Sequence, residues 1–249
     1  PDIVKNGIVS PKDDFETIET ELALADYETL EKQKDPGGSP DKELQKRWTV
    51  IKKLKEEMQG GKSARDVDLN EEELKVAKSL SLLTLKPILI ALNVDEGDLA
   101  RAGEIEEHFS VSLGVQKDQV VAICAKTESE LSDLSEEDQK SYLKDLGVES
   151  SGLERLIRKA FSTLGLITFL TAGEKEVRAW TIKEGINAQE ASGVIHTDFM
   201  LKFIKADVVN FSDFVSLGWK KSREDGKCRS EGRDYLVKDG DVIEFKIGQ

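Results

Sequence analysis

Two short apolar runs constrain the fold more than any other feature of this sequence. The first is KPILIAL, residues 86–92, and the second is QVVAI, residues 119–123. Continuous apolar runs of this length are typical of strands buried on both faces of a sheet. Residues 99–109 between them fit a helix, and strand, helix, strand forms a right-handed crossover with parallel strands. We therefore predict an α/β fold in which the loops after both strands emerge at one sheet edge, where ligands bind.

A pair of helices is predicted before the first strand. Apolar residues recur at helical spacing in residues 13–32 and again in residues 42–58. Between them lies DPGGSPD, residues 35–41, whose prolines and glycines would break any helix. Two helices joined by a short breaker predict an antiparallel hairpin or coiled coil.

A Gly-Lys-Ser stretch at residues 61–63 raises the question of a phosphate-binding loop. Such a loop needs a further glycine five positions earlier, a strand before it and a helix directly after it. Position 56 is Glu, and the preceding segment is helical. Asn70 with Glu73 three positions on is typical of the start of a new helix. Gly60 and Gly61 are therefore interpreted as a helix end and turn rather than a phosphate cradle.

The last part of the chain has a different pattern. LITFL, EVRAW and DVIEFKI carry β-branched and apolar residues typical of strands, while AQEASGVIH fits one short helix. Strands around a helix predict a small α+β domain. An Asp-Gly turn at residues 239–240 predicts that the final strand is an edge or hairpin strand. Trp180 is expected in the core, and His196 is expected to satisfy nearby backbone groups, with partner recognition as the alternative.

Charge is unevenly distributed along the chain. The 249 residues carry a net charge of -13, which excludes wholesale nucleic-acid binding. From Leu166 onward there are 13 Lys and Arg against 14 Asp and Glu, and the first 165 residues hold 23 against 35. Only the last part could therefore contact RNA. A basic segment with Trp219 beside it supplies candidates, with a solvated, flexible loop as the alternative: Lys220, Lys221, Arg223, Lys227, Arg229 and Arg233.

Other sequence features predict the cellular location, the state of the cysteines and the absence of a metal site. No apolar run approaches the roughly 18 residues of a membrane span, so we expect no membrane contact and a cytoplasmic location. Cys124 and Cys228 are too far apart for a short metal motif, and they are expected to be reduced thiols, with a redox switch as the alternative. With His108 and His196 as its two histidines, the chain predicts no metal site. We expect a monomer.

The loops after the two predicted strands carry the strongest functional signal. NVDE at residues 93–96 and CAK at residues 124–126 resemble the paired base-recognition loops of P-loop GTPases, Asn-Lys-x-Asp and Ser-Ala-Lys. The matching residues are Asn93, Val94, Glu96, Cys124, Ala125 and Lys126. Val94, Glu96 and Cys124 depart from the pattern. A longer Glu96 would displace the carboxylate that binds guanine, so relaxed or adenine-leaning preference is a hypothesis. Taken alone, NxxE also fits a surface loop with an Asx turn.

The order of these segments closely resembles that of the YchF-type Obg-like ATPases over essentially the whole chain. The most specific segments are LITFLTAGEKEVRAWTIKEG, GVIHTDF and KDGDVIEF. The resemblance implies a partial P-loop NTPase G domain interrupted by an α-helical coiled coil, followed by a TGS domain of the β-grasp type. By residue, it implies a G-domain segment at 1–25, the helical insertion at 26–82, the rest of the G domain at 83–165 and the TGS domain at 166–249.

The resemblance also implies an activity. Members bind and hydrolyse ATP, and GTP less well, with Mg²⁺, and they associate with ribosomes. Their phosphate loop and Mg²⁺ ligands come earlier than anything in this chain, so the chain alone is expected to bind nucleotide weakly, and no catalytic residue is assigned. A different class of function stays open, namely a non-catalytic ribosome- or RNA-binding module built from the coiled coil and TGS domain. A TGS module from a tRNA synthetase or stringent-response enzyme is disfavoured, because no zinc or synthetase motif precedes it.

Overall fold

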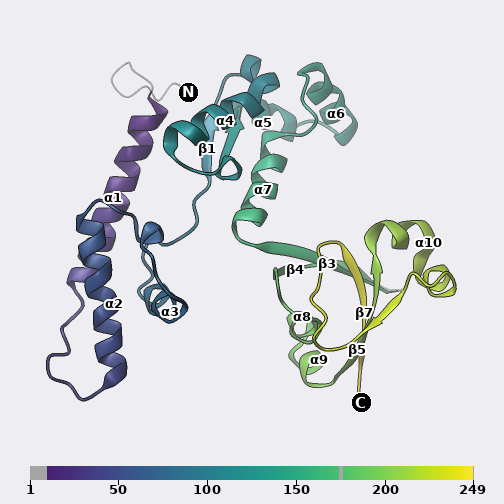
Figure 1. The fold of residues 1–249 in the computed structure, drawn as a ribbon. Coiled ribbons are helices and arrows are strands. Elements are labelled where there is room, and N and C mark those ends of the chain that lie inside the picture. Colours follow the sequence, from purple (N-terminus) through teal and green to yellow (C-terminus); the bar gives the residue numbers. More distant parts are fainter. Residues whose placement is uncertain (1–9, 174–175, 249) are drawn as a thin grey trace. The chain divides into compact units, whose positions relative to one another are not determined.

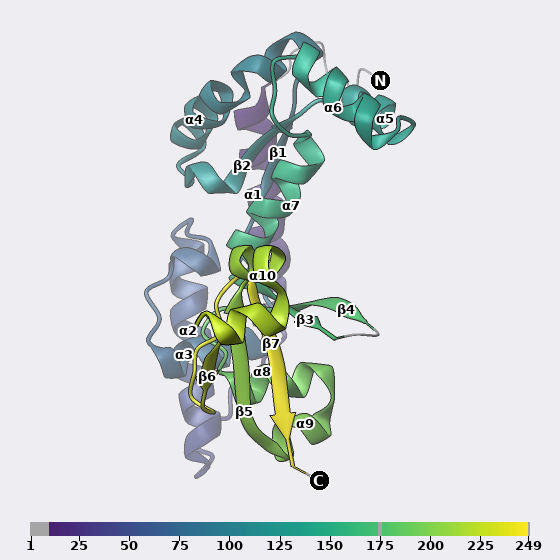
Figure 2. The same cartoon turned by 90° about the vertical axis from the view of Figure 1, so that its right-hand side faces the viewer.

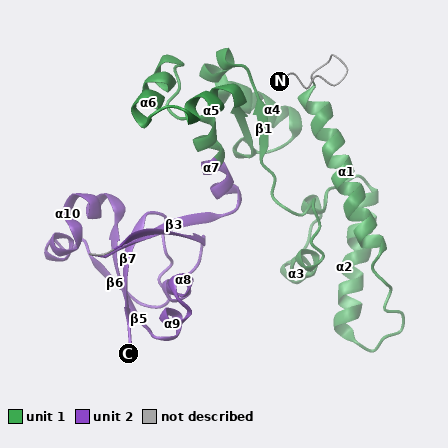
Figure 3. Ribbon diagram, turned by 180° about the vertical axis from the view of Figure 1, so that it is seen from behind, with its two compact units in different colours: residues 1–156 green, residues 157–249 purple. Residues whose placement is uncertain are grey.

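The computed structural model describes residues 10–173 and 176–248 and divides into two compact units, residues 1–156 and 157–249 (Figures 1 and 3). Each unit is described by itself below. Residues 1–9 of the expected first G-domain segment lie outside the described residues. Within the described chain, no helix is long and apolar enough to cross a membrane.

The first part of unit 1 is helical, as predicted. Helix α1 spans Pro11–Glu31, α2 spans Lys42–Gln59 and α3 spans Glu71–Ser79. Side-chain hydrogen bonds join Tyr27 to Gln59 and Glu19 to Ser63, so α1 and α2 run antiparallel, side by side (Figure 1). The predicted capping box of α3 is confirmed, because Asn70 and Glu73 exchange hydrogen bonds of 2.9 Å. Leucines and other apolar side chains of the three helices and their loops form one buried cluster.

The remainder of unit 1 is the predicted crossover. Strand β1 spans Ile90–Asn93 and β2 spans Val120–Ile123, and they pair in parallel from Ile90–Val120 to Asn93–Ile123. Helix α4, Ala102–Leu113, connects them and packs against β2. Three further helices follow β2: α5 at Ala125–Ser132, α6 at Glu136–Asp145 and α7 at Gly152–Thr163.

One part of the strand prediction is wrong. β2 is buried, but β1 is shorter than the apolar run, and its Ala91 is exposed. The physical reason is that α4 covers β2, and among the described residues β1 pairs on one side only. A continuous apolar run therefore did not mark a strand covered on both faces here.

The outer edge of β2 is closed by side chains instead of a third strand. The N–H of Ala122 donates to Glu106 Oε1 at 3.0 Å, and its carbonyl accepts from Arg155 Nη2 at 2.6 Å. Arg155 and Glu106 also pair with each other at 3.1 Å. Because Glu106 is 5% exposed, its buried charge is balanced by the guanidinium and the N–H. This arrangement ties α4 and α7 to the same point of the sheet.

Unit 2 is a five-stranded sheet in the order β4-β3-β7-β5-β6. Its strands are β3 at Leu166–Ala172, β4 at Val177–Lys183, β5 at Phe203–Asn210, β6 at Arg229–Glu231 and β7 at Asp241–Ile247. Helices α8, Ala188–Ile195, and α9, Thr197–Leu201, precede β5, and α10, Phe211–Glu224, follows it. Phe169, Ala188 and Val208 are among the completely buried residues of its core.

The strands expected from LITFL, EVRAW and DVIEFKI and the helix expected from AQEASGVIH are confirmed. The placement of the last strand is wrong, because β7 lies in the middle of the sheet between β3 and β5. The Asp-Gly turn is present, with Gly240 at φ 77°. It ends the connection from β6, at the edge of the sheet, to β7, in its centre. A local turn signal fixes the turn and not the position of the strand that follows.

Candidate functional site

The two predicted base-recognition loops meet at the end of the parallel strands of unit 1. Asn93 is the last residue of β1, and its Oδ1 accepts a hydrogen bond of 3.1 Å from the Ala125 N–H. The Val94 N–H donates to the Ile123 carbonyl at 2.9 Å. Because Asn93 spans the gap with its side chain, the loop at residues 93–96 and the loop at residues 124–126 form one continuous surface.

The remaining predicted residues take different positions around this junction. Cys124 is 4% exposed and precedes α5, so its thiol is part of the interior. Lys126, on the first turn of α5, is exposed and lies 3.8 Å from Glu130. Glu96 begins a short 3₁₀ helix that ends at Arg101. A carboxylate, an amide and an ammonium group therefore surround the two loops, and each can bind the polar edge of a planar ligand.

Tyr142 on α6 lies near the same junction and was missed in the sequence. Its hydroxyl donates to Glu130 Oε2 at 2.8 Å. That hydrogen bond, burial and the nearby charges of Glu130, Glu96 and Cys124 raise the pKa of Tyr142 to about 12. Glu130 also lies 3.8 Å from Lys126 Nζ, so Tyr142 is linked to the second loop through Glu130. No local motif marks this tyrosine, because α6 reaches the junction only through the fold.

The Gly-Lys-Ser stretch lies elsewhere, in the turn after α2. Lys62 pairs with Glu57 at 2.7 Å, and the Ser63 hydroxyl donates to Glu19 at 3.0 Å. A short 3₁₀ turn at Ala64–Asp66 follows. The stretch follows a helix, and its lysine and serine bind carboxylates, so this Gly-Lys-Ser does not form a strand-to-helix phosphate loop.

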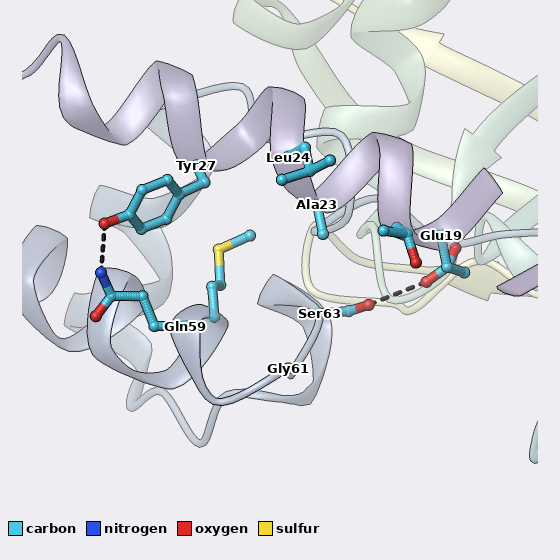
Figure 4. Close-up of a pocket in the computed structure, with 9 residues that line it drawn as sticks. Glu19, Ala23, Leu24, Tyr27, Gln59, Gly61 and Ser63 are labelled. Carbon is cyan, nitrogen blue, oxygen red and sulfur yellow. Dashed lines mark hydrogen bonds between the residues drawn. The ribbon is translucent and has the colours of Figure 1, made fainter. Parts of the chain in front are cut away.

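A cavity of about 420 Å³ lies beside this turn, between α1 and the end of α2 (Figure 4). Ala23, Leu24 and Met58 supply its apolar wall, and Glu19 and Gln59 supply polar groups at its rim. At either side of it, the Tyr27–Gln59 hydrogen bond joins α1 to α2, and the Glu19–Ser63 hydrogen bond joins α1 to the turn after α2. The cavity is thus a feature of the helical hairpin and is separate from the junction at Asn93.

The basic residues of unit 2 are divided between regular elements and the segments that connect them, where Lys227 and Arg233 lie. Lys220, Lys221 and Arg223 lie on α10, and Arg229 lies on β6. Arg223 pairs with Glu244, Lys227 lies 3.7 Å from Asp213, and Arg229 bonds to Tyr235 at 3.0 Å. Lys220 and Lys221 are exposed and, within the described chain, form no ion pair. Helix α10 was not predicted from the sequence, and Gly218 interrupts it with a φ of 65°.

The other predicted polar residues have ordinary local roles. His196 Nδ1 accepts a hydrogen bond of 3.2 Å from the Asp198 N–H, which confirms its predicted backbone contact. Trp180 is partly exposed and not fully in the core. Both cysteines are unpaired thiols. Among residues 10–173 and 176–248, no group of three or more His, Cys, Asp and Glu side chains is arranged to hold a metal ion.

Comparison with known proteins shows relatives over nearly the whole chain. The family model of the YchF-GTPase C-terminal region, described as a protein of unknown function (DUF933), matches residues 166–248. In solved structures, the Schizosaccharomyces pombe YchF GTPase matches with a TM-score of 0.81 and 28% identity, over 98% of this chain and 68% of that one. A GTP-binding protein from Pyrococcus horikoshii, at 16% identity and a TM-score of 0.54, shares the fold alone.

Curated relatives carry the same family name. The protein called ribosome-binding ATPase YchF in Bacillus subtilis is 42% identical over 97% of this chain and 68% of its own length. Proteins of that name in Haemophilus influenzae and Escherichia coli O157:H7 are 41% and 40% identical. Identity at this level over nearly the full length shows that the chain belongs to the YchF family.

Proposed function

We propose that the junction of the two loops binds the purine base of a nucleotide, as part of a ribosome-associated ATPase. The single observation that carries this proposal is the Asn93–Ala125 hydrogen bond, which joins the two loops at the carboxyl ends of parallel strands. Ligands of α/β proteins bind at such ends. The names of the relatives support the activity, because they are called ribosome-binding ATPases and a GTPase.

Each loop residue has a proposed role in this function. Asn93 uses its carbonyl oxygen to hold the Ala125 amide, and its side-chain NH₂ stays available for a ring nitrogen of the base. Glu96 presents its carboxylate to the exocyclic edge. Val94, Cys124 and Ala125 shape the walls, and the stem of Lys126 covers the ring. Because the Glu96 stem is one methylene longer than that of aspartate, we propose a relaxed or ATP-leaning preference.

The proposal assigns no ligand of the phosphates or of Mg²⁺ among the described residues. When bound, Mg²⁺ supplies charge neutralisation during phosphoryl transfer. The described residues form no acidic cluster that fits it, and Gly61, Lys62 and Ser63 are engaged in the helical hairpin. Base contacts of about 1 kcal/mol each do not offset an association cost of roughly 4–15 kcal/mol. We therefore propose weak nucleotide binding by this chain alone and assign no catalytic residue.

The proposed function assigns a separate domain to each part of the chain. Residues 1–25 and 83–165 would belong to a G domain, residues 26–82 to a coiled-coil insertion and residues 166–249 to a TGS domain of the β-grasp type. The parallel pair of β1 and β2 supports the G-domain assignment. In residues 166–249, the five-stranded sheet and α8 support the β-grasp assignment.

Ribosome contact is the second element of the proposal. Lys220 and Lys221 on α10 are the basic side chains best placed to contact rRNA, since they are exposed and form no ion pair within the described chain. Arg223, Lys227 and Arg229 are engaged with acidic or phenolic partners and would have to exchange them. The same lysines favour the alternative function, a ribosome- or RNA-binding module without catalysis.

The base site is tested by NMR titration of this chain with AMP and with GMP. We expect shifts of the amides in residues 93–96 and 124–126, with dissociation constants in about the millimolar range. Glu96→Asp should move preference toward GMP, and Glu104→Asp, on α4, is the matched control. Absence of shifts at these amides would overturn the base site, and micromolar ATP affinity by calorimetry would contradict the proposed weak binding.

Ribosome contact is tested separately by cosedimentation. Replacing Lys220 and Lys221 with Glu should weaken binding to purified ribosomes and reduce its salt dependence. Lys183→Glu, an exposed change on β4, is the control. Unchanged cosedimentation of the double variant would remove α10 from the contact. If nucleotide binding fails while ribosome binding persists, the non-catalytic module becomes the better description.

A further inference from the structure

The sheet of unit 2 opens between its two central parallel strands. Among the described residues, β3 and β7 share one register pair, Leu170 with Val242. On its other side, β7 stays paired with β5 as far as Phe203–Ile247. Figure 2 shows the β3–β4 hairpin leaving the rest of the sheet. Since a strand directs its N–H and C=O groups alternately to both sides, the β7 groups beyond Val242 that face β3 have no strand partner in the described chain.

A cavity of about 580 Å³ occupies this opening. Its walls include residues 171–173 at the end of β3 and residues 243–245 of β7, which are the positions just beyond the single pair. The rings of Trp180, Phe199 and Trp219 complete the lining. A free strand edge and an aromatic pocket therefore lie side by side.

The two tryptophans are held in place by the β3 side of the opening. Trp180 Nε1 donates to Thr171 Oγ1 at 2.9 Å, and Trp219 Nε1 donates to the Ala172 carbonyl at 2.7 Å. Trp219 reaches this position because Gly218, with φ 65° and ψ 179°, breaks α10 one residue earlier. The indole of Trp219 thus satisfies the Ala172 carbonyl at the end of β3. The edge of β7 that faces this carbonyl is left for another partner. A pocket with fixed walls loses little entropy on binding.

We infer that this opening is a docking site for an extended peptide of a partner protein, which adds to β7 as a strand. Strand addition uses main-chain hydrogen bonds for affinity and pockets for alternate side chains for specificity. Here the aromatic rings would receive one apolar side chain of the peptide. The charged lining residues are Glu176, Arg223 and Glu244, and Arg223 pairs with Glu244. Two acidic groups and one basic group do not attract the negatively charged phosphates of a nucleic acid. The lining therefore favours a peptide over RNA.

The test uses the full chain and a displayed library of random peptides long enough for one strand. Selected peptides are then synthesised and bound to the chain in hydrogen-exchange experiments. We expect slower exchange of those amides in residues 243–247 that face the opening, and no change in the alternate amides that face β5. N-methylation of alternate peptide amides along one edge should abolish binding, while N-methylation along the other edge should leave it unchanged. This pattern distinguishes strand addition from a peptide held only by its side chains.

A pair of variants tests the pocket. Trp219→Ala should weaken peptide binding at least about tenfold, the usual effect of losing an aromatic anchor at an interface. Val215→Ala, an exposed position on the same helix, should not change it. The exchange measurement on the unchanged chain keeps the test valid if Trp219→Ala unfolds. Failure to select peptides, insensitivity to N-methylation, protection elsewhere, or displacement of the peptide by poly(U) would each overturn the inference.

Discussion

The carboxylate of Asp26 in α1 accepts hydrogen bonds from both the N–H and the hydroxyl of Thr84, each at 2.7 Å. A third bond, of 2.6 Å, comes from the Leu83 N–H. Thr84 Oγ1 in turn accepts from the Ala64 N–H at 3.0 Å. Asp26 is 2% exposed and Thr84 is completely buried, so this chain of bonds fixes α1, the turn after α2 and the loop after α3 to one another.

Asp26→Asn should therefore lower the free energy of unfolding of the helical part by about 2–3 kcal/mol, because one of its oxygens becomes a donor that faces other donors. Urea denaturation followed by Trp48 fluorescence measures the change in this region, since Trp48 packs against the same core. Glu21→Gln, an exposed change on α1, is the matched control and should have little effect. Equal stability of the two variants would contradict a structural role for Asp26.

Asn93→Ala should open the junction of the two base-recognition loops. Loss of the bond to the Ala125 N–H is expected to cost about 1 kcal/mol and to speed hydrogen exchange of that amide. Asn93→Asp keeps the accepting oxygen and should retain most of the protection. The prediction is wrong if both variants exchange at the same rate as the unchanged chain.

Gly152→Ala and Gly103→Ala should change stability in opposite directions. A Cβ at Gly152 would lie 2.9 Å from Glu128 Oε1 and 3.1 Å from Ile123 Cγ2, and Glu128 caps the start of α7 through the Gly152 N–H at 2.7 Å. This variant should lose about 1–3 kcal/mol. Gly103 lies in α4 with nothing within 4 Å of an added Cβ, so alanine there should gain about 0.5–1 kcal/mol. Denaturation midpoints moving in the same direction would refute the packing argument.

Stability of unit 2 should fall at high pH through Tyr235. Burial, together with donation of its hydroxyl to Asp241 at 2.8 Å, raises the pKa of Tyr235 from 10.0 to about 12. A raised folded pKa favours the neutral form, so the contribution is complete below pH 10 and is lost as pH rises through about 12.

The measurement compares Tyr235→Phe with the unchanged chain across that pH range, using the fluorescence of the unit's tryptophans. At neutral pH the variant should be about 1 kcal/mol less stable for the lost hydrogen bond. The difference should shrink between pH 10 and pH 12. Tyr27→Phe in unit 1 controls for general alkaline effects. A stability difference that does not change with pH would exclude ionisation of the Tyr235 phenol as the cause.

The helical hairpin and the parallel crossover were predictable because their signals are local. Apolar spacing, the breaker at residues 35–41 and the Asn70 cap all act within a few residues. The exposure of β1 was not predictable, since it depends on which elements cover the strand. The position of β7 was also hidden, because pairing with β3 and β5 joins segments far apart in the sequence.

The candidate site was predictable only in part, for the same reason. The two loops were expected together because both follow parallel strands. Tyr142 contacts Glu130, the ion-pair partner of Lys126, from a helix without a motif. Arg223 and Arg229 have acidic or phenolic partners that their neighbours in sequence do not reveal. Helix α10 was not predicted, and one glycine with a positive φ, Gly218, interrupts its helical pattern.

The hydrogen bonds at Ala122 determine at which of its two edges the small parallel sheet of unit 1 can pair with a further strand. Glu106 and Arg155 occupy the donor and acceptor that a neighbouring strand would need on that flank. Among the described residues, the edge of this sheet that can accept an additional strand is therefore that of β1, whose Ala91 is exposed. The sheet is closed against edge-to-edge self-association on one side and receptive on the other.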